Sequence, residues 1–303
     1  MKFGVREICD VVFKAKAKTT IGNTTFEQGQ PVLYIDSAKT STMEGAATTV
    51  YAQGGKGNAR LIAWEGEKTL TFTVEDALLS PIGFSVLSGA GLFKGKDDTE
   101  KVHVHTTANA VVSADNKIDL SDVLATGEVI DESAPVFVML MEDGSISEVV
   151  KATDVDETEI TVDTAAAGKT VFVDFYVTKA GNVVSELQID AENFAGSYYV
   201  EASTLFRRES DGKDMPAEIT LPNVKIQSNF TFSMASTGDP STFTFTMDAF
   251  PGYTMFDKSK KVLCVIQIVD ETAAEKALGK SVMLHDDNEI IEEEKVDSDD
   301  LSI

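Results

Sequence analysis

Apolar and polar residues alternate most regularly between Asn229 and Phe250, in the run NFTFSMASTGDPSTFTFTMDAF. Side chains of a strand point to opposite faces in turn, so each half of this run has one apolar face and one face of serine and threonine hydroxyls. Residues 236–240 include a glycine and a proline, which favour a turn. The pattern therefore predicts an antiparallel hairpin. Its expected apolar core consists of Phe230, Phe232, Phe243 and Phe245.

The first third of the chain is also predicted to be β-rich. Residues 1–35 read as short strands around a Gly22-Asn23 turn, and residues 45–65 are expected to form a hairpin that turns at residues 54–58. In residues 69–74, TLTFTV, every second residue is apolar, which predicts a further strand.

One helix is predicted after these strands. Ser80 has the side chain of a good N-cap, and Pro81 suits the first helical position. A glycine, either Gly89 or Gly91, is expected to end the helix. The apolar side of this helix would consist of Ile82, Val86 and Leu87. A single helix beside many strands would cover the end or the open face of a sandwich.

The rest of the chain alternates between strands and turn signals. Turns are predicted at Asp143-Gly144, Ala167-Gly168 and residues 211–214. The nearly continuous apolar run of residues 262–269 predicts a central strand buried on both faces. Residues 272–284 are interpreted as a short helix.

Together these patterns predict a mainly β protein, an antiparallel β-sandwich or barrel with one short helix and an inserted β-rich region. Residues 1–109 and 186–285 would form the two halves of one domain. Residues 110–185 would be the insertion, for which an immunoglobulin-like module is one interpretation, and residues 286–303 a disordered acidic tail.

Two runs of the sequence resemble phage tail tube and related tail structural proteins. Residues 217–250, from AEITLPNVKIQ through the hairpin, are similar to the C-terminal half of that family. Residues 42–91, TMEGAATTVYAQGGKGNARLIAWEGEKTLTFTVEDALLSPIGFSVLSGAG, are similar to the N-terminal half. The resemblance implies a tube subunit that forms hexameric rings, stacked into a tube through which DNA passes. It also implies a virion tail protein, assembled in the host cytoplasm. A further hypothesis is that the acidic tail shields an assembly surface until a basic partner, such as a sheath or baseplate protein, displaces it.

The formal net charge of −24 bears on these partners. Residues 286–303 contain nine acids and Lys295, a net −8, which leaves −16 for the rest of the chain. Such a charge repels phosphates and argues against specific DNA binding, which depends on clustered Lys and Arg. An acidic conduit would let DNA slide without sticking, whereas the alternative is that the acidity only keeps the protein soluble.

The sequence predicts no membrane segment, because no apolar run approaches about 20 residues. The N-terminus is interrupted by Arg6, Glu7 and Asp10 and does not read as a signal peptide. Two distant cysteines, Cys9 and Cys264, show no paired framework and favour a reducing compartment.

Catalytic and cofactor motifs are not predicted. The Gly-rich residues 54–57 lack the spacing and the following helix of a phosphate-binding loop, so a flexible hairpin tip is the preferred interpretation. His103 and His105 would share a strand face, but two ligands do not make a metal site. The acids of residues 154–159 do not have calcium-loop spacing. No cofactor, metal or catalytic residue is therefore assigned.

Two segments are candidates for contacts between subunits. The glycine-rich turn supplies Gly54, Gly55, Lys56, Gly57 and Arg60. Arg207 and Arg208 belong to a mixed-charge patch, which would either pair with the next subunit or form the polar rim of a hairpin.

The preferred function is a structural subunit of a phage tail tube whose rings self-associate and stack. The alternative is a virion decoration or host-surface-binding protein with an immunoglobulin-like module. A glycan-active enzyme is a third, weaker hypothesis, because paired carboxylates are available but Trp64 is the only tryptophan.

Overall fold

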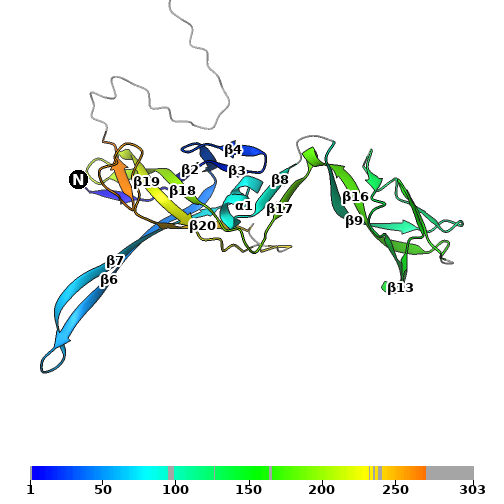
Figure 1. Ribbon diagram of the computed structural model, residues 1–303, viewed down its shortest axis with the longest axis horizontal. Helices are drawn as coiled ribbons and strands as arrows, with labels where there is room; N and C mark the ends of the chain where they lie inside the picture. The colour runs from blue at the N-terminus through cyan, green and yellow to red at the C-terminus, as the bar shows by residue number, and fades with distance from the viewer. Residues whose placement is uncertain are drawn as a thin grey trace, which may run out of the picture.

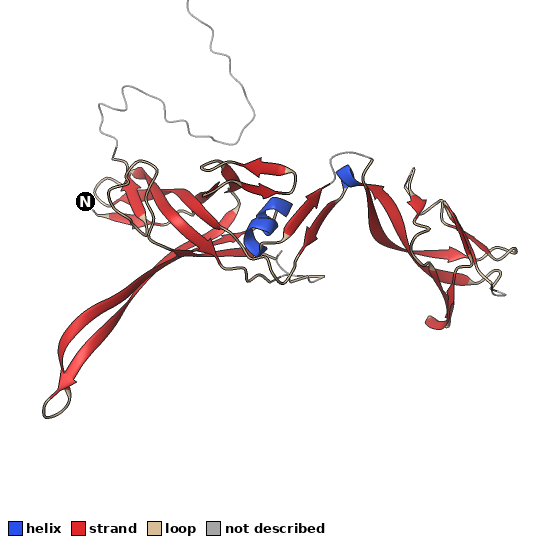
Figure 2. Cartoon of the chain, viewed as in Figure 1, coloured by secondary structure: helices blue, strands red, loops and turns tan. Residues whose placement is uncertain are grey.

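A computed structural model describes residues 2–94, 99–125, 127–163, 166–231, 233–234, 236–237 and 241–270. Over these residues the chain is mainly β, its sheets are antiparallel, and there is one α-helix and no closed barrel (Figures 1 and 2). The prediction of a mainly β fold with one short helix is thus confirmed. The predicted helix at residues 272–284 and the acidic tail lie outside the described residues.

The largest sheet has the strand order β5-β2-β18-β19-β20-β7-β6, with β1 also paired to β18 and β21 to β19. These strands are β1 (Phe3–Val5), β2 (Asp10–Ala15), β5 (Pro31–Ile35), β6 (Ala38–Gly54), β7 (Ala59–Asp76), β18 (Ser197–Arg208), β19 (Asp214–Ile226), β20 (Phe243–Ala249) and β21 (Val265–Ile268). All pair antiparallel. We call it the main sheet.

One face of the main sheet carries the larger core because apolar residues occupy alternate positions of its strands. On β20, Phe245 and Met247 are buried, and on β7 Phe72 and Val74 are buried opposite them. The intervening positions are polar, as the alternation of residues 69–74 predicts. A small hairpin, β3 (Thr19–Ile21) and β4 (Thr24–Phe26), adds Ile21 to this core.

The helix α1 (Pro81–Ser88) packs on this core as the sequence predicts. The hydroxyl of Ser80 accepts a hydrogen bond from the Gly83 amide at 2.9 Å, which caps the N-terminus. Gly89 ends the helix in the left-handed conformation, with φ of 77°. The side chains of Val86 and Leu87 are buried against the sheet.

A second unit has a separate core and lies at one end of the long axis of the molecule (Figure 1). Its strands are β9 (Lys101–Val111), β10 (Lys117–Asp119), β11 (Val129–Ile130), β12 (Phe137–Glu142), β13 (Ser145–Lys151), β14 (Asp154–Asp156), β15 (Glu159–Thr161) and β16 (Thr170–Ala180). The antiparallel pair β8 (Gly91–Lys94) and β17 (Ser185–Gln188), with the short 3-10 helix η1 (Gly181–Val183), joins it to the main sheet. The division of the chain into domains at residues 110 and 185 stays a prediction.

The hairpin predicted at Asn229–Phe250 is wrong in its first half. Residues 227–231 and 233–234 form no strand, whereas Phe243–Ala249 form β20. β20 pairs with β7 along residues 243–248 but with β19 only along residues 247–249. A hydrogen bond from the Gln227 amide to the Thr246 carbonyl continues the second ladder by one residue, and the described residues beyond it form no strand.

The prediction of a central strand at residues 262–269 is also wrong. Only Val265–Ile268 form a strand, β21, which pairs with β19 alone. β21 pairs with residues 217–220 of β19, and β20 pairs with residues 224–226 of the same edge. Ile266 and Val269 are nearly half exposed, so the segment is not buried on both faces.

Candidate functional site

The face of the main sheet opposite the core carries a regular array of threonines and carboxylates on β6, β7 and β20. Cross-strand register places these side chains in three rows. The rows are Asp248-Thr71-Glu44, Thr246-Thr73-Thr42 and Thr244-Glu75-Thr40. All nine residues are exposed or half-buried, and none is Lys or Arg. We call this array the hydroxyl–carboxylate face.

Hydrogen bonds hold two of its carboxylates in place. Thr71 Oγ1 donates to Asp248 Oδ1 at 3.2 Å, and Thr40 Oγ1 donates to Glu75 Oε2 at 3.2 Å. The Thr242 hydroxyl donates to the other oxygen of Glu75. The hydroxyls of Thr242 and Thr40 lower the pKa of Glu75 below its usual value because they stabilise the carboxylate. The face is therefore negatively charged at neutral pH.

Beyond the main sheet, β6 and β7 continue as a two-stranded ribbon that projects from the body of the molecule (Figure 1). We call residues 45–70 the arm. Register shifts between Ala47 and Thr49 and between Ala52 and Gln53 interrupt its ladder, a feature that bends and twists a ribbon. The hairpin predicted at residues 45–65 is confirmed and is longer than expected, because the separately predicted strand at residues 69–74 is part of β7.

The arm exposes apolar side chains on both of its faces. Val50 lies opposite Trp64 on one face, and their exposed fractions are 63 % and 54 %. Tyr51 lies opposite Ala63 on the other face, and Leu61, which is unpaired at the second register shift, is 66 % exposed. An isolated two-stranded ribbon is only marginally stable in water, and exposed apolar patches mark interaction surfaces. The arm therefore has the character of a contact element.

The tip of the arm brings together the five residues predicted there. Gly55, Gly57 and Asn58 have positive φ values of 77°, 87° and 49°, which glycine and asparagine tolerate in a tight turn. The Lys56 side chain is exposed. The Arg60 guanidinium lies 4.2 Å from the centroid of the Tyr51 ring.

Arg207 and Arg208 lie elsewhere, next to the β18–β19 turn, and both are engaged within the chain. Arg207 donates to the two carboxylate oxygens of Asp214 at 2.7 and 2.8 Å. Arg208 pairs with Asp270 and lies 3.5 Å from a carboxylate oxygen of Asp211. These pairs favour the polar-rim interpretation, and a role between subunits stays a prediction.

Of the four phenylalanines predicted to form the hairpin core, three are described, and only Phe245 is fully buried. Phe245 is 1 % exposed, and its ring centroid lies 5.8 Å from that of Phe13. Phe230 and Phe243 are partly buried against the same core, and Phe230 meets Phe84 edge to face at 4.9 Å. Phe232 lies outside the described residues.

The histidines of β9 form pairs with carboxylates. His103 pairs with Asp131, and His105 Nε2 lies 2.7 Å from Asp174 Oδ1. In the part of the chain that the structure describes, no group of three or more His, Cys, Asp or Glu residues could hold a metal ion. The same part contains no helix long and apolar enough to cross a membrane. Cys9 and Cys264 are free thiols.

Sequence reasoning anticipated the threonines of β20 but missed the rest of the hydroxyl–carboxylate face. The alternation in residues 69–74 was a usable signal, because it places Thr71 and Thr73 opposite Phe72 and Val74. The contribution of β6 had no comparable signal, since its polar and small residues do not alternate with apolar ones.

Comparison with protein families gives a match that covers most of the chain. The model described as the YomU/Tube protein family matches residues 18–262, which include the arm, the hydroxyl–carboxylate face and the second unit. A search of curated proteins gave no match.

Proposed function

The chain belongs to the YomU/Tube protein family, a phage tail tube family, and from this premise we propose that its copies form closed rings that stack into a DNA-conducting tube. Family membership makes the chain a structural protein of the virion tail and not an enzyme. Self-assembly in the tail follows from the same membership, whereas the geometry of that assembly is our proposal.

The hydroxyl–carboxylate face carries the proposal that one wall of the subunit lines the lumen. DNA is a polyanion that binds proteins through Lys and Arg, and none of the nine residues of this face is either, although Lys225 of β19 lies beside Asp248 in the sheet. Its three carboxylates repel phosphates, while its threonine hydroxyls keep the surface hydrated. Such a wall would guide DNA and would not retain it.

Free strand edges provide the means to close a ring. Among the described strands β6 pairs only with β7, and β5 pairs only with β2, so both ends of the main sheet are open. An unpaired edge is a template for another chain, and heterologous contacts that close on themselves generate rings. We infer that neighbouring subunits join their main sheets through these edges, with six-fold symmetry as the family resemblance implies.

The arm would then bind a neighbouring subunit of the same or an adjacent ring. Its apolar side chains Val50, Leu61, Ile62 and Trp64 are each more than half exposed. Sheath and baseplate proteins are further proposed partners of the assembled tube.

Negative-stain electron microscopy of the purified full-length chain at high concentration tests this function. We expect stacked rings or hollow tubes with the wild-type chain. The variant Val50→Ser/Trp64→Ser should give far fewer tubes at an unchanged melting temperature, because both side chains are exposed. The matched control Val149→Ser/Ile146→Ser changes exposed apolar residues of the second unit. Wild-type chain that remains dispersed under all conditions would contradict the proposal.

A second candidate function concerns the second unit alone. Because it has a core of its own and lies at the end of the molecule, it fits a module on the outside of the tube that meets a host surface or another virion protein. Density for this unit outside the tube wall in a reconstruction would agree with that function, and density within the lumen would refute it.

A further inference from the structure

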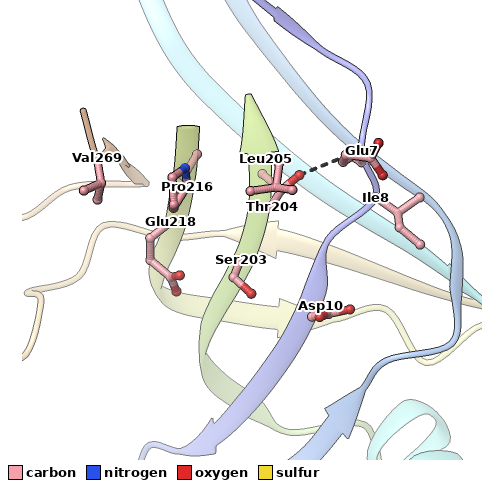
Figure 3. Close-up of a pocket in the computed structure, with 10 residues that line it drawn as sticks. Glu7, Ile8, Asp10, Ser203, Thr204, Leu205, Pro216, Glu218 and Val269 are labelled. Atoms are coloured by element: carbon pink, nitrogen blue, oxygen red, sulfur yellow. Dashed lines mark hydrogen bonds between the residues drawn. The ribbon is translucent and has the colours of Figure 1, made fainter. Parts of the chain in front are cut away.

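A groove lies on the main sheet between β2, β18 and β19, on the face opposite the core (Figure 3). Its volume is about 450 Å³. The segment that precedes β2 forms one side of it and is fixed there by a hydrogen bond of 3.1 Å from Thr204 Oγ1 to the Glu7 carbonyl. Val269, just beyond β21, closes the other side.

The groove has an apolar lining that is open to solvent. Ile8, Leu205 and Val269 contribute to it with exposed fractions of 41 %, 36 % and 48 %. Pro216 and Ala217 add further apolar surface. Apolar side chains that gather in an open hollow favour occupation by apolar groups of a partner.

Among the described residues that line the groove, every charged one is a carboxylate. Glu7, Asp10 and Glu218 are the charged residues that line the groove. None of the three forms an ion pair with a described Lys or Arg residue. Burial raises the pKa of Glu218, the nearby Glu201 raises it further, and the charge of Lys14 partly offsets the rise. The groove is thus apolar and acidic, and its carboxylates form no close ion pair in the described chain, although the charge of Lys14 acts on Glu218 and that of Arg207 interacts with Glu7.

The distal half of the arm has the complementary character. Between residues 49 and 64 the only charged residues are Lys56 and Arg60, although the chain as a whole carries −24. They are surrounded by the exposed apolar side chains of Val50, Leu61 and Trp64. Ten residues of β6 lie in the arm, so it reaches about 30 Å beyond the sheet at about 3.3 Å per residue. The tip can therefore contact a different copy of the chain.

We propose that the arm of one copy docks into the groove of a second copy. Lys56 and Arg60 would meet the carboxylates, and apolar side chains of the arm would cover the apolar lining. This inference rests on the proposed function, because it names the surface that receives the arm in the assembled tail. A closed set of such contacts is heterologous, since each copy donates one arm and receives another.

A charge-reversal experiment tests the pairing. Lys56→Glu/Arg60→Glu should raise the protein concentration needed for assembly at least tenfold, as should Glu7→Lys/Asp10→Lys/Glu218→Lys. The variant that combines all five substitutions should assemble at a concentration close to that of the wild type, because the arm is then negative and the groove positive, which restores opposite charges. Matched controls reverse exposed charges of the second unit and should assemble as wild type does: Lys101→Glu/Lys169→Glu and Glu142→Lys/Glu148→Lys/Asp156→Lys. Sedimentation velocity and thermal melting of each variant separate assembly from folding.

Photo-crosslinking keeps this inference distinguishable from the proposed function. Benzoylphenylalanine in place of Trp64, in a mixture of isotope-labelled and unlabelled chains, should crosslink between copies to the segments that line the groove, even in dimers. Tubes that form normally with the groove reversed, or crosslinks that map elsewhere, would overturn the docking and leave the tube function intact. Crosslinks found only within one copy, and none between copies, would also overturn the docking. Wild-type chain that crosslinks as proposed but never forms tubes would instead contradict the tube function.

Discussion

Arg60 lies over the ring of Tyr51, with the guanidinium carbon 4.2 Å from the ring centroid. The two residues sit on opposite strands near the tip of the arm. The ring therefore orients Arg60 before any partner binds, which reduces the entropy lost on binding. The guanidinium also covers part of the Tyr51 ring that water would otherwise contact.

We expect Tyr51→Ala to weaken assembly and to leave the fold intact. An exposed cation–π contact contributes about 0.5–1 kcal/mol, so the concentration needed for assembly should rise about twofold to fivefold. The melting temperature of the dilute chain should not change. Sedimentation velocity over a concentration series measures the first quantity, and Tyr51→Phe, which keeps the ring, serves as the control. Equal effects of both variants would show that the ring does not act through Arg60.

Gly89 is a position where only glycine fits. Its φ is +77°, and an added Cβ would lie 2.3 Å from the carbonyl carbon of Phe194 and 2.6 Å from the amide nitrogen of Ala195. We expect Gly89→Ala to lower the free energy of unfolding by roughly 3 kcal/mol or more, because the added Cβ would both clash with the backbone and force alanine into a left-handed conformation. Gly127→Ala is the control, because its φ is +83° but nothing lies within 4 Å of the added Cβ. It should cost only about 1–2 kcal/mol, the penalty of the left-handed conformation. Urea denaturation compares the two.

Local signals were sufficient for some elements of the fold. Ser80, Pro81 and Gly89 specify the ends of α1 through contacts within a few residues, so the helix was predictable. The same holds for the turn at residues 54–58, whose glycines permit the backbone conformation. Helix ends and turns of this kind depend on residues within one short segment, so the sequence is sufficient to predict them.

Elements that depend on distant partners were not predictable. The alternation in residues 229–250 suggested a local hairpin, but β20 pairs along most of its length with β7, a strand from the first third of the chain, and only at its end with the preceding strand β19. The hydroxyl–carboxylate face has the same origin, because its rows join Glu44, Thr71 and Asp248. No pattern within one segment records which strands become neighbours.

Glu218 should give the dilute chain a measurable pH dependence. Its pKa is raised in the folded state by burial, so the ionised side chain opposes folding, and this penalty is relieved as the pH falls through the folded pKa. We expect Glu218→Gln to stabilise the chain at pH 7 by less than about 1 kcal/mol, since the residue is only half-buried. The difference should shrink toward pH 4. Thermal unfolding at both pH values measures it, with the exposed Glu148→Gln as control; a stabilisation that persists unchanged at pH 4 would contradict this origin.

Cys264 should react slowly as long as the chain is folded. Burial raises its pKa to about 11, so at pH 8 only about 0.1 % is thiolate, compared with about a quarter of an ordinary cysteine. Burial also raises the pKa of Cys9, which is 5 % exposed. Alkylation by iodoacetamide should be on the order of 100-fold slower in the native chain than in urea. Mass spectrometry of quenched samples follows each thiol, and rapid native alkylation at either residue would contradict the burial described here.

The charge of the hydroxyl–carboxylate face should decide whether assembled tubes retain DNA. Tubes of Glu44→Lys/Glu75→Lys/Asp248→Lys should bind short duplex DNA with a steep salt dependence, because each contacted phosphate releases counter-ions. Wild-type tubes should bind none. Nuclease protection distinguishes the lumen from the exterior, since DNA held inside a tube is shielded from the enzyme. Tubes of Glu142→Lys/Glu148→Lys/Asp156→Lys, with the same charge change on the second unit, should leave any bound DNA open to digestion. If the two triple variants bind DNA that is equally sensitive to nuclease, the hydroxyl–carboxylate face does not line the lumen.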